Sequence, residues 1–315
     1  MAGLKLKTAI QTLGHTMDLK DGTVKPQGFD FAFEEVPAII QVFRRMVRGN
    51  EFDISEMAIT TYLCARAHGK RFTALPIFLV RAFHHGAIVH NTTLGIRRPK
   101  DLEGRRVGVN RGYTVTTGVW ARAVLQHEHG VDLSRITWVL SGDEHVAEYR
   151  APANVVPVET GMKLEELLAS GEVAAAIGVS SEHPDVAPLI ADAREAGFAA
   201  LQANGYYPIN HTLVVRDELL EAHPGLAREV FEVFAEAKRR YVERLKHDQI
   251  AEPSANDKRY RQVMQITGAD PLPYGLAPNR RMIEAVIAYA GEQGIIKRLP
   301  AVEELFARGT HDLVG

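Results

Sequence analysis

The stretch FRRMVRGNEFDISEMAITT, residues 43–61, decides the fold because the chain repeats its pattern at LEELLASGEVAAAIGVSS, residues 164–181. Each copy reads as an amphipathic helix, a closing glycine, an acidic or polar turn, a short apolar strand and then small polar residues. Gly49 and Gly171 hold equivalent places, and we expect each to be the C-cap residue after its helix. Two copies of one pattern predict two lobes of similar build.

Short strands alternate with helices on both sides of this repeat. We expect strands at residues 4–11, 52–59, 74–80, 84–90, 105–110, 136–140, 172–180 and 211–215. We expect helices at residues 36–49, 60–69, 119–130, 162–171, from Gly225 onward and at 280–294, with Thr60 or Thr61 as an N-cap. This alternation predicts an α/β protein in which mostly parallel sheets carry helices on both faces.

Length and composition narrow the class of protein. A chain of 315 residues predicts two domains or one two-lobed body. The net charge is −2 and no run of Lys or Arg occurs, so we expect neither a nucleic-acid nor a membrane partner. The single cysteine, Cys64, excludes an intrachain disulfide and lies in a helix-like run, where we expect it to be buried.

The N-terminal stretch MAGLKLKTAIQTLG has no continuous apolar core and no small-residue cleavage site after one. It therefore does not resemble a secretory signal, and we expect the protein in the cytoplasm. The longest apolar run, ALPIFLV at residues 74–80, is too short to span a bilayer.

Polar side chains cluster where the expected strands end. In parallel α/β sheets, ligands bind beyond the carboxyl ends of the strands. That rule selects the segments GHTMD (14–18), SEMAITT (55–61), RAFHHG (81–86), RGYTVTTG (111–118), GVSSEHPD (178–185) and GYYPINH (205–211).

RGYTVTTG, residues 111–118, has the clearest mechanism among these segments. A strand precedes it and a helix follows it, so its backbone N–H groups and the helix dipole favour an anion. The hydroxyl groups of Tyr113, Thr114 and Thr116 add hydrogen-bond donors. The alternative is N-capping of the helix by one threonine. The turn matches neither GxxxxGK[ST] nor GxGxxG, so it is no standard nucleotide motif.

The segment LVRAFHHGAIVH, residues 79–90, carries charged and titratable groups within a strand-like run. If the strand continues through it, alternation puts Arg81 and His85 on one face and His84 on the other. His84 and His85 could not then share a metal, whereas Arg81 and His85 could face one anion together. The alternative is that both line a wet sheet edge.

Motifs for metals, nucleophiles and cofactors are absent from the sequence. There is no HExxH or CxxC spacing and no GxSxG elbow. We expect no cofactor and no sequence-encoded metal site, and a divalent metal held by scattered His and Glu side chains stays open.

The phrase GIRRPKDLEGRRVGV, residues 95–109, is typical of the type II periplasmic-binding-protein superfamily. That resemblance implies two lobes, each a mostly parallel sheet flanked by helices, with a ligand cleft between them. We place lobe one at residues 1–103 and 211–315, and lobe two at residues 104–210.

Further phrases resemble the 4,5-dihydroxyphthalate decarboxylase family over nearly the whole chain and in the same order. They are GFDFAFEEVP (28–37), MVRGNEFDISEMAITTYL (46–63), LPIFLVRAFHHGAIVHN (75–91), VWARAVLQHEHGVD (119–132), GYYPINHTLVVRDELLEAHP (205–224) and PYGLAPNRRMIEA (273–285). The resemblance implies a cytoplasmic carboxy-lyase of phthalate degradation that converts a dihydroxylated aromatic dicarboxylate to protocatechuate. The family usually has Arg before the His of RAFxH, and this chain has His84 there.

Such a reaction needs a clamp for the spectator carboxylate, a base near a phenol and an acid near the ring carbon. We expect His85 and His211 to transfer protons, with Glu56 orienting a histidine or accepting from a hydroxyl group. The expected substrate-binding residues are Arg81, His84, His15, Ser55, Thr60, Tyr113, Thr114, Thr116 and Asn210.

Two other functions stay open at this point. One is a non-catalytic solute-binding protein for a small carboxylate, because the fold hosts both jobs. The other is an enzyme that makes a thiamine-pyrimidine or menaquinone precursor, which the absence of an iron-binding cysteine motif disfavours. We expect a small aromatic carboxylate as the partner, and the helical C-terminal part leaves a homo-oligomer open.

Overall fold

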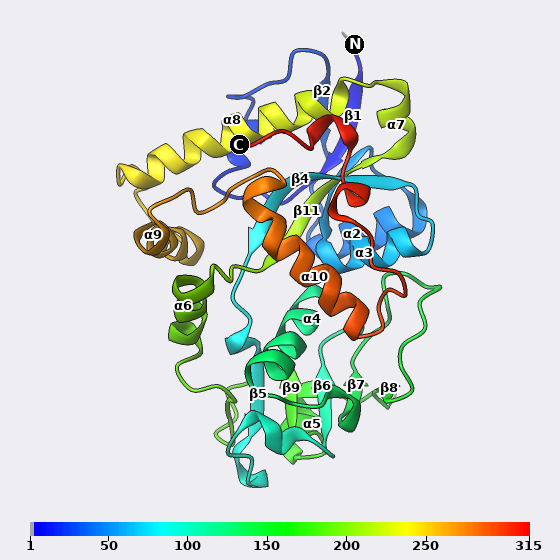
Figure 1. The fold of residues 1–315 in the computed structure, drawn as a ribbon, viewed down its shortest axis with the longest axis vertical. Helices are drawn as coiled ribbons and strands as arrows, with labels where there is room; N and C mark the ends of the chain where they lie inside the picture. The colour runs from blue at the N-terminus through cyan, green and yellow to red at the C-terminus, as the bar shows by residue number, and fades with distance from the viewer. Residues whose placement is uncertain (1–2, 160) are drawn as a thin grey trace. The chain divides into compact units, whose positions relative to one another are not determined.

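The computed structural model describes residues 3–159 and 161–315, and it divides into two compact units (Figure 1). Unit 1 comprises Met1–Arg81, Ile209–Ala285 and Pro300–Gly315, and unit 2 comprises Ala82–Pro208 and Val286–Leu299. Within the described ranges no helix is long and apolar enough to cross a membrane.

A five-stranded sheet, in the order β2-β1-β3-β11-β4, forms the centre of unit 1. Its strands are β1 Lys5–Ala9, β2 Asp30–Phe33, β3 Ile54–Ala58, β4 Phe72–Arg81 and β11 Ile209–Arg216. β1 pairs in parallel with β2 and β3, whereas β11 is antiparallel to both β3 and β4. β11 is therefore the reversed strand among four that run in one direction.

A six-stranded sheet, in the order β10-β5-β9-β6-β7-β8, forms the centre of unit 2. Its strands are β5 Ile88–Asn91, β6 Arg106–Val109, β7 Thr137–Leu140, β8 Val155–Pro157, β9 Ala175–Ile177 and β10 Val186–Pro188. β6 pairs in parallel with β7 and β9, β7 pairs in parallel with β8, and β5 is antiparallel to β9 and β10. Here β5 is the reversed strand.

The two sheets share one topology. The order β2-β1-β3-β11-β4 in unit 1 matches β7-β6-β9-β5-β10 in unit 2, with β8 added at one edge. β3 and β9, the strands of the repeated sequence pattern, hold the same place, between a parallel neighbour and the reversed strand. The prediction of two similarly built α/β bodies with mostly parallel strand direction is confirmed.

Helices flank both sheets. They are α1 Met17–Lys20, α2 Ile39–Gly49, α3 Ile59–Ala67, α4 Thr116–Ala123, α5 Leu164–Ser170, α6 Ala193–Asn204, α7 Asp217–Ala222, α8 Leu226–Lys246, α9 Ala255–Thr267 and α10 Arg280–Glu292. A π-helical turn, Val124–Glu128, continues α4. The sequence patterns did not predict β2, β8, β10, α1, α6, α7 or α9.

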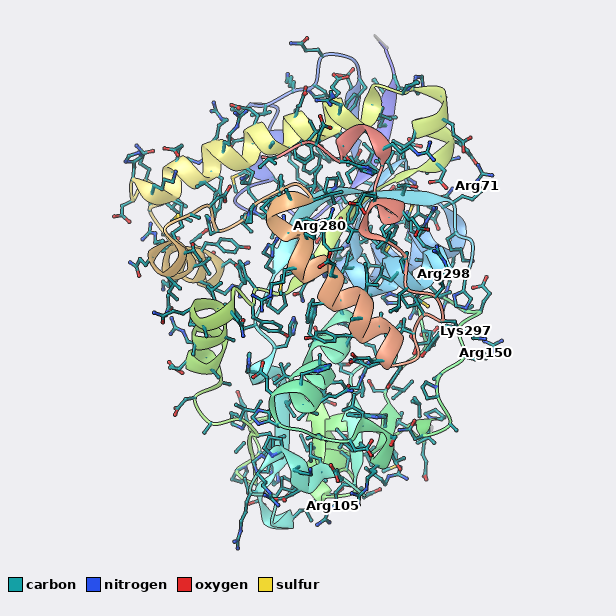
Figure 2. All side chains as sticks on the ribbon, viewed as in Figure 1. Arg71, Arg105, Arg150, Arg280, Lys297 and Arg298 are labelled. Carbon is teal, nitrogen blue, oxygen red and sulfur yellow. The ribbon has the colours of Figure 1, made fainter. Side chains whose placement is uncertain are left out.

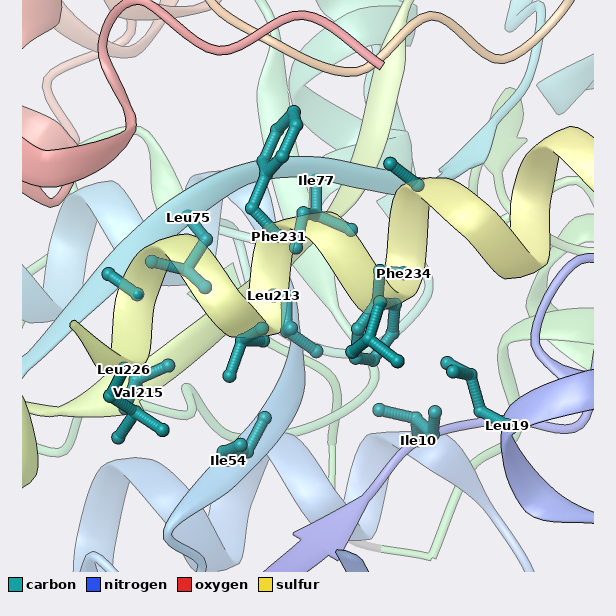
Figure 3. Close-up of a cluster of buried hydrophobic side chains, with 14 of the residues drawn as sticks. Ile10, Leu19, Ile54, Leu75, Ile77, Leu213, Val215, Leu226, Phe231 and Phe234 are labelled. Atoms are coloured by element: carbon teal, nitrogen blue, oxygen red, sulfur yellow. The ribbon is translucent and has the colours of Figure 1, made fainter. Parts of the chain in front are cut away.

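The main apolar core of unit 1 lies between helix α8 and the central strands. Leu226, Phe231 and Phe234 on α8 are buried with Leu75 of β4 and Leu213 of β11, as Figure 3 shows. The long amphipathic pattern that follows Gly225 accounts for this contact, because its apolar stripe repeats with the helical period. In unit 2 a smaller cluster packs α5 on the sheet.

Charged side chains lie mainly on the surfaces of the two units. Arg71 in unit 1 and Arg105 in unit 2 are exposed and project from the ribbon (Figure 2). Their scatter agrees with the absence of Lys/Arg runs in the sequence.

Residues 82–103 belong to unit 2, whereas the sequence analysis assigned them to lobe one. The physical reason is pairing, since β5 hydrogen-bonds β9 and β10 in the second sheet. Residues 286–299, within α10 and the segment after it, also group with unit 2.

Two details of the predicted helix ends are wrong. The left-handed residue that ends α2 is Asn50, with φ of 50°, while Gly49 is the last helical residue. Gly171 does take the left-handed position after α5, with φ of 82°. Neither Thr60 nor Thr61 caps α3, because the helix begins at Ile59 directly after β3 and its N-cap residue is Ala58.

Replacing the two glycines of the repeated pattern should therefore have different effects. We expect Gly171→Ala to lower the free energy of unfolding by about 1–2 kcal/mol, because an L side chain is strained at this φ. Gly49→Ala is the matched control and should leave stability unchanged or raise it, since Gly49 is helical and its nearest obstacle is the flexible side chain of Glu51. Urea unfolding would measure both, and equal losses would contradict the assignment.

Candidate active site

The candidate residues of unit 1 gather at one edge of its sheet. Because β11 runs opposite to its neighbours, its first residues lie beside the carboxyl ends of β3 and β4. Ser55, Glu56 and Thr60 come from β3 and the start of α3, Arg81 ends β4, and Asn210 and His211 begin β11. Parallel strand ends of this kind are where α/β sheets bind ligands.

Glu56 and His211 form a hydrogen-bonded pair. The Nδ1–H group of His211 donates to Oε1 of Glu56 over 2.6 Å, and the backbone N–H of Gln11 donates to Oε2 of Glu56 over 2.9 Å. Glu56 is fully buried, whereas the side chain of His211 is 16% exposed. Glu56 therefore holds the imidazole through Nδ1, and Nε2 is the ring nitrogen that does not contact Glu56.

Irregular pairing sets the position of His211. The register between β11 and β4 shifts on both sides of His211, which marks a bulge. Bulges re-aim side chains and recur beside functional sites. The ring of Phe43 meets the imidazole edge to face, with 5.0 Å between the ring centroids. The bulge and this aromatic contact hold the imidazole in one orientation.

Arg81 is buried in a polar and aromatic setting. Its guanidinium donates to the side-chain oxygen of Asn279 and lies 5.6 Å from the ring centroid of Phe78. The amide nitrogen of Asn279 in turn donates to the carbonyl of Gly275 over 2.8 Å. Arg259 donates to the backbone carbonyl of Arg81 over 3.0 Å. Unit 1 thus holds a fixed cation at the sheet edge that carries His211.

The remaining unit 1 candidates are also buried. Ser55 and Thr60 are fully buried and Asn210 is nearly so. The hydroxyl oxygen of Ser55 has no hydrogen-bond partner among the residues that the structure describes.

His15 lies on the segment between β1 and α1, in a setting different from that of His211. It is 1% exposed, and neither ring nitrogen makes a hydrogen bond of normal geometry within the described part of the chain. Burial lowers the pKa of His15 to about 4, with the positive charge of Lys238 acting in the same direction and the Leu79 carbonyl opposing it. The imidazole is therefore neutral near pH 7.

The turn at residues 111–118 in unit 2, which we predicted to bind an anion, binds a carboxylate of the chain itself. The backbone N–H groups of Tyr113 and Thr114 and the hydroxyl group of Thr114 donate to the carboxylate of Glu144, the hydroxyl over 2.6 Å. A Cβ atom at Gly112 would lie 2.5 Å from Oε2 of Glu144, so a side chain there would displace the carboxylate from the turn. Thr116 is buried in the first turn of α4. The alternative prediction, that a threonine N-caps this helix, is wrong, because the N-cap residue is Val115.

A buried arginine lies against the same turn. Arg122 of α4 is fully buried, its Nη2 donates to the carbonyl of Tyr113 over 2.6 Å, and its guanidinium stacks 3.8 Å from the centre of the Tyr113 ring. Its Nε donates to Gln293 over 2.8 Å. Burial lowers the pKa of the Arg122 guanidinium. This turn therefore combines backbone donors with a desolvated positive charge.

Unit 2 contains a second carboxylate–histidine pair. The Nε2–H group of His85 donates to the carboxylate of Glu128, at 2.9 Å from Oε2. Glu128 ends the π-helical turn after α4, and single π turns are frequent at functional sites. His85 is 1% exposed, and its Nδ1 is buried without a partner in the described ranges.

The strand-parity prediction for Arg81 and His85 is wrong. β4 ends at Arg81, His85 begins a 3-10 turn, and the boundary between the two units falls directly after Arg81. Arg81 and His85 therefore share no strand face. His84 precedes the turn and is buried in unit 2.

The described ranges contain no group of three or more His, Cys, Asp and Glu side chains placed to hold a metal ion. The pairs Glu56–His211 and Glu128–His85 each bring two such side chains together.

Two curated proteins are similar to this chain over most of their length. A 4,5-dihydroxyphthalate decarboxylase from Comamonas testosteroni is 31% identical over 97% of this chain and 97% of its own. One from Pseudomonas putida is 33% identical over 65% of this chain and 84% of its own. The chain belongs to the 4,5-dihydroxyphthalate decarboxylase family. The predicted membership is thus confirmed, although no family model matches the chain.

Solved structures place this family member among periplasmic-binding-protein-like folds. The aliphatic sulphonate-binding protein SsuA from Escherichia coli aligns with a TM-score of 0.55 and 12% identity over 99% of this chain and all of its own. The alkanesulfonate-binding SsuA from Xanthomonas axonopodis pv. citri aligns with a TM-score of 0.50 and 17% identity over 98% of each chain. The desulfurization enzyme DSZB aligns with a TM-score of 0.51 and 15% identity over 96% of each. These likenesses concern the fold alone.

Sequence reasoning missed the partners of several candidates in this decarboxylase-family chain. Asn279, Glu128, Glu144 and Arg122 contact predicted residues, but none was singled out. Asn279 lies in the family phrase PYGLAPNRRMIEA, and Glu128 lies in the family phrase VWARAVLQHEHGVD. Their place in these phrases is the sequence signal that could have identified them. The roles of the predicted site residues themselves stay predictions.

The neutral, buried state of His15 predicts a dependence of stability on pH. Between pH 6.5 and pH 4 the unfolded chain takes up a proton that folded His15 does not. The free energy of unfolding should therefore fall over this range, by about 3 kcal/mol at most. The loss should be absent in His15→Phe.

Urea unfolding at pH 7 and pH 5 measures this difference. His247→Phe is the control, because that side chain is 66% exposed and should leave the pH dependence unchanged. An identical slope in wild type and His15→Phe would show that His15 is protonated in the folded protein.

Proposed function

We propose that this protein removes carbon dioxide from 4,5-dihydroxyphthalate and releases protocatechuate. The observation that carries the proposal is the Glu56–His211 pair, buried at a ligand-binding sheet edge in a chain that belongs to a family named for this reaction. The fold alone does not distinguish an enzyme from a solute-binding protein, because solute-binding proteins share it.

The reaction needs proton transfer and no organic electron sink. Each carboxylate of 4,5-dihydroxyphthalate has a hydroxyl group para to it. Partial loss of the phenol proton pushes electron density to the carbon that carries the carboxylate. That carbon takes a proton, the bond to the carboxyl carbon breaks, and carbon dioxide leaves as the ring becomes aromatic again. One proton is consumed for each carbon dioxide released.

His211 has the properties of the proton carrier. Its Nδ1–H group is held by Glu56, so Nε2 can accept a proton as the neutral ring or deliver one as the cation. Glu56 stabilises the cation and holds the ring in place, as the carboxylate does in catalytic triads. Glu56 is thus a positioning residue, and the Gln11 N–H group fixes it in turn.

Arg81 supplies the positive charge in unit 1. A guanidinium matches the planar geometry of a carboxylate and donates two parallel hydrogen bonds to it. Its contact with Asn279 orients the group before substrate arrives. We assign the spectator carboxylate of the substrate to Arg81.

The second pair, Glu128–His85, has the chemistry for the same kind of proton step in unit 2. The donors of the Tyr113–Thr114 turn are taken up by the carboxylate of Glu144, so the proposal gives them no contact with the substrate. We keep His85 as the second proton carrier of the proposal.

We also propose that the enzyme works in the cytoplasm, in the degradation of phthalates. The single cysteine, which is buried, suits a reducing compartment. Cell fractionation with an antibody against the chain tests the location, and recovery with periplasmic markers would contradict it.

Turnover tests the function directly. The purified protein should release carbon dioxide from 4,5-dihydroxyphthalate with equimolar protocatechuate, and phthalate without hydroxyl groups should not react because it cannot donate electron density. Tight binding of the dihydroxylated acid without any product would favour the solute-binding alternative and reject the enzyme.

Substitutions at the pair test the mechanism. We expect His211→Gln to lower kcat by about 10²–10⁴-fold, the usual contribution of one proton-transferring histidine. Glu56→Gln should lower kcat less and leave KM nearly unchanged, because Glu56 acts through His211.

His247→Gln is the matched control on an exposed helix end and should keep full activity. Circular dichroism shows whether each variant is folded. A folded His211→Gln protein that keeps more than about a tenth of the activity would remove His211 from the proton-transfer step, since the expected loss is far larger.

A further inference from the structure

A small pocket of about 200 Å³ lies in unit 1, where β1 and β2 end and α2 begins. Its wall consists of residues 10–12, residues 34–37, Ile39 and Val42. The volume is below the roughly 300–1,000 Å³ that is usual for a whole small-molecule site. The pocket therefore suits one end of a ligand.

The pocket adjoins the Glu56–His211 pair. Gln11 lines the pocket, and its backbone N–H group donates to Oε2 of Glu56 over 2.9 Å. Val42 of α2 also lines it, and the next residue, Phe43, packs its ring against that of His211. The pocket thus lies beside the residues to which we assign proton transfer.

The side-chain amide of Gln11 is a hydrogen-bonding group that the fold does not use. Gln11 is partly exposed, and its side chain makes no hydrogen bond within the described ranges. An amide offers N–H donors and an acceptor oxygen. A hydroxyl group matches both, because it donates and accepts, whereas a carboxylate only accepts. A hydroxyl group is therefore the better partner for this amide.

The ionic groups around the pocket are already paired. Lys20 donates to Glu35 over 2.6 Å, and Arg45 donates to Glu34 over 2.6 Å. No Lys, Arg or His side chain lines the pocket in the part of the chain that the structure describes. A carboxylate would find no positive side chain in this wall, whereas Arg81 supplies one at the end of β4.

The strand order sets these groups along one edge of the sheet. Arg81 ends β4, His211 lies on β11 and Glu56 lies on β3, while Gln11 follows β1, the next strand in the sheet. Three strand spacings, about 14 Å, separate β4 from β1. In 4,5-dihydroxyphthalate the hydroxyl groups lie on the side of the ring opposite to the carboxylates. A substrate whose carboxylate binds Arg81 therefore extends its hydroxyl groups toward Gln11.

We propose that this pocket binds the ring hydroxyl groups of the substrate and that Gln11 recognises one of them. The side-chain amide forms the hydrogen bonds, and the backbone N–H group of Gln11 continues to donate to Glu56. The start of α2, where the N-cap residue Ala38 supplies no side-chain cap, favours negative charge on the hydroxyl oxygen as its proton leaves. Because the ligand is taken to be the substrate of the Glu56–His211 pair, this role of Gln11 rests on the proposed function.

Protocatechuate and benzoate are the probes for the test. Each carries one carboxylate, and only protocatechuate carries two hydroxyl groups. Calorimetry measures the affinity of the full chain for each acid at equilibrium, without turnover. We expect wild type to bind protocatechuate more tightly than benzoate. Gln11→Leu should bind protocatechuate about tenfold more weakly than wild type does, because the hydroxyl group loses its partner. Its affinity for benzoate should stay unchanged.

Two further variants separate recognition from folding. Gln41→Leu is the matched control, because Gln41 is exposed on α2 and does not line the pocket. It should bind both acids as wild type does. Val36→Trp keeps Gln11 and narrows the pocket at a partly exposed position, so it should weaken the binding of protocatechuate and not that of benzoate. Circular dichroism checks that each variant is folded.

Three results would overturn the proposal. They are equal affinities of wild type for the two acids, an unchanged affinity of Gln11→Leu for protocatechuate, and a loss in Gln11→Leu that is the same for benzoate. The turnover assay is decided separately. The expected binding pattern without release of carbon dioxide would reject the enzyme and keep the hydroxyl pocket. Turnover together with any of the three results would keep the enzyme and reject the pocket.

Discussion

The pairing of β11 between β3 and β4 is the interaction on which the candidate site depends. β11 begins directly after the chain returns from unit 2, and it enters the first sheet antiparallel to both neighbours. Antiparallel pairing sets the start of β11 against the carboxyl ends of β3 and β4. His211 thereby meets Glu56, which lies 155 residues away in the chain, at the edge where Arg81 ends β4.

The same constraint recurs in unit 2. β5 is the reversed strand there, and His85 lies directly before it, as His211 lies at the start of β11. Each histidine pairs with a glutamate, but the glutamates come from different places. Glu56 is on the strand next to β11, whereas Glu128 is on the π-helical turn after α4. The two units therefore share a topology without sharing the origin of their polar contacts.

Fold and function separate clearly in this protein. Sulfonate-binding proteins and a desulfurization enzyme share its architecture at low sequence identity, so the architecture does not choose between binding and catalysis. The chemistry comes from particular side chains. A buried carboxylate that orients an imidazole is an arrangement suited to moving protons, and burial keeps that arrangement rigid. His15 is not oriented in this way, because no carboxylate hydrogen-bonds to it within the described part of the chain.

The sequence by itself determined the local elements, the two-unit build and the family. Each of these can be read from short stretches of sequence without knowledge of tertiary contacts. They rest on the hydrophobic periods, on the pattern repeated at 43–61 and 164–181, and on the family phrases. It also picked out Glu56, His211 and the Tyr113–Thr114 turn, because polar residues at strand ends are visible in a sequence.

Only the tertiary structure decided which of these residues meet. The end of β4 at Arg81 separated it from His85. The antiparallel pairing of β11 with β3 brought His211 to Glu56. The carboxylate of Glu144 accepts the hydrogen bonds of the Tyr113–Thr114 turn. Strand register, bulges and π turns depend on contacts between distant segments, so no local pattern could encode them.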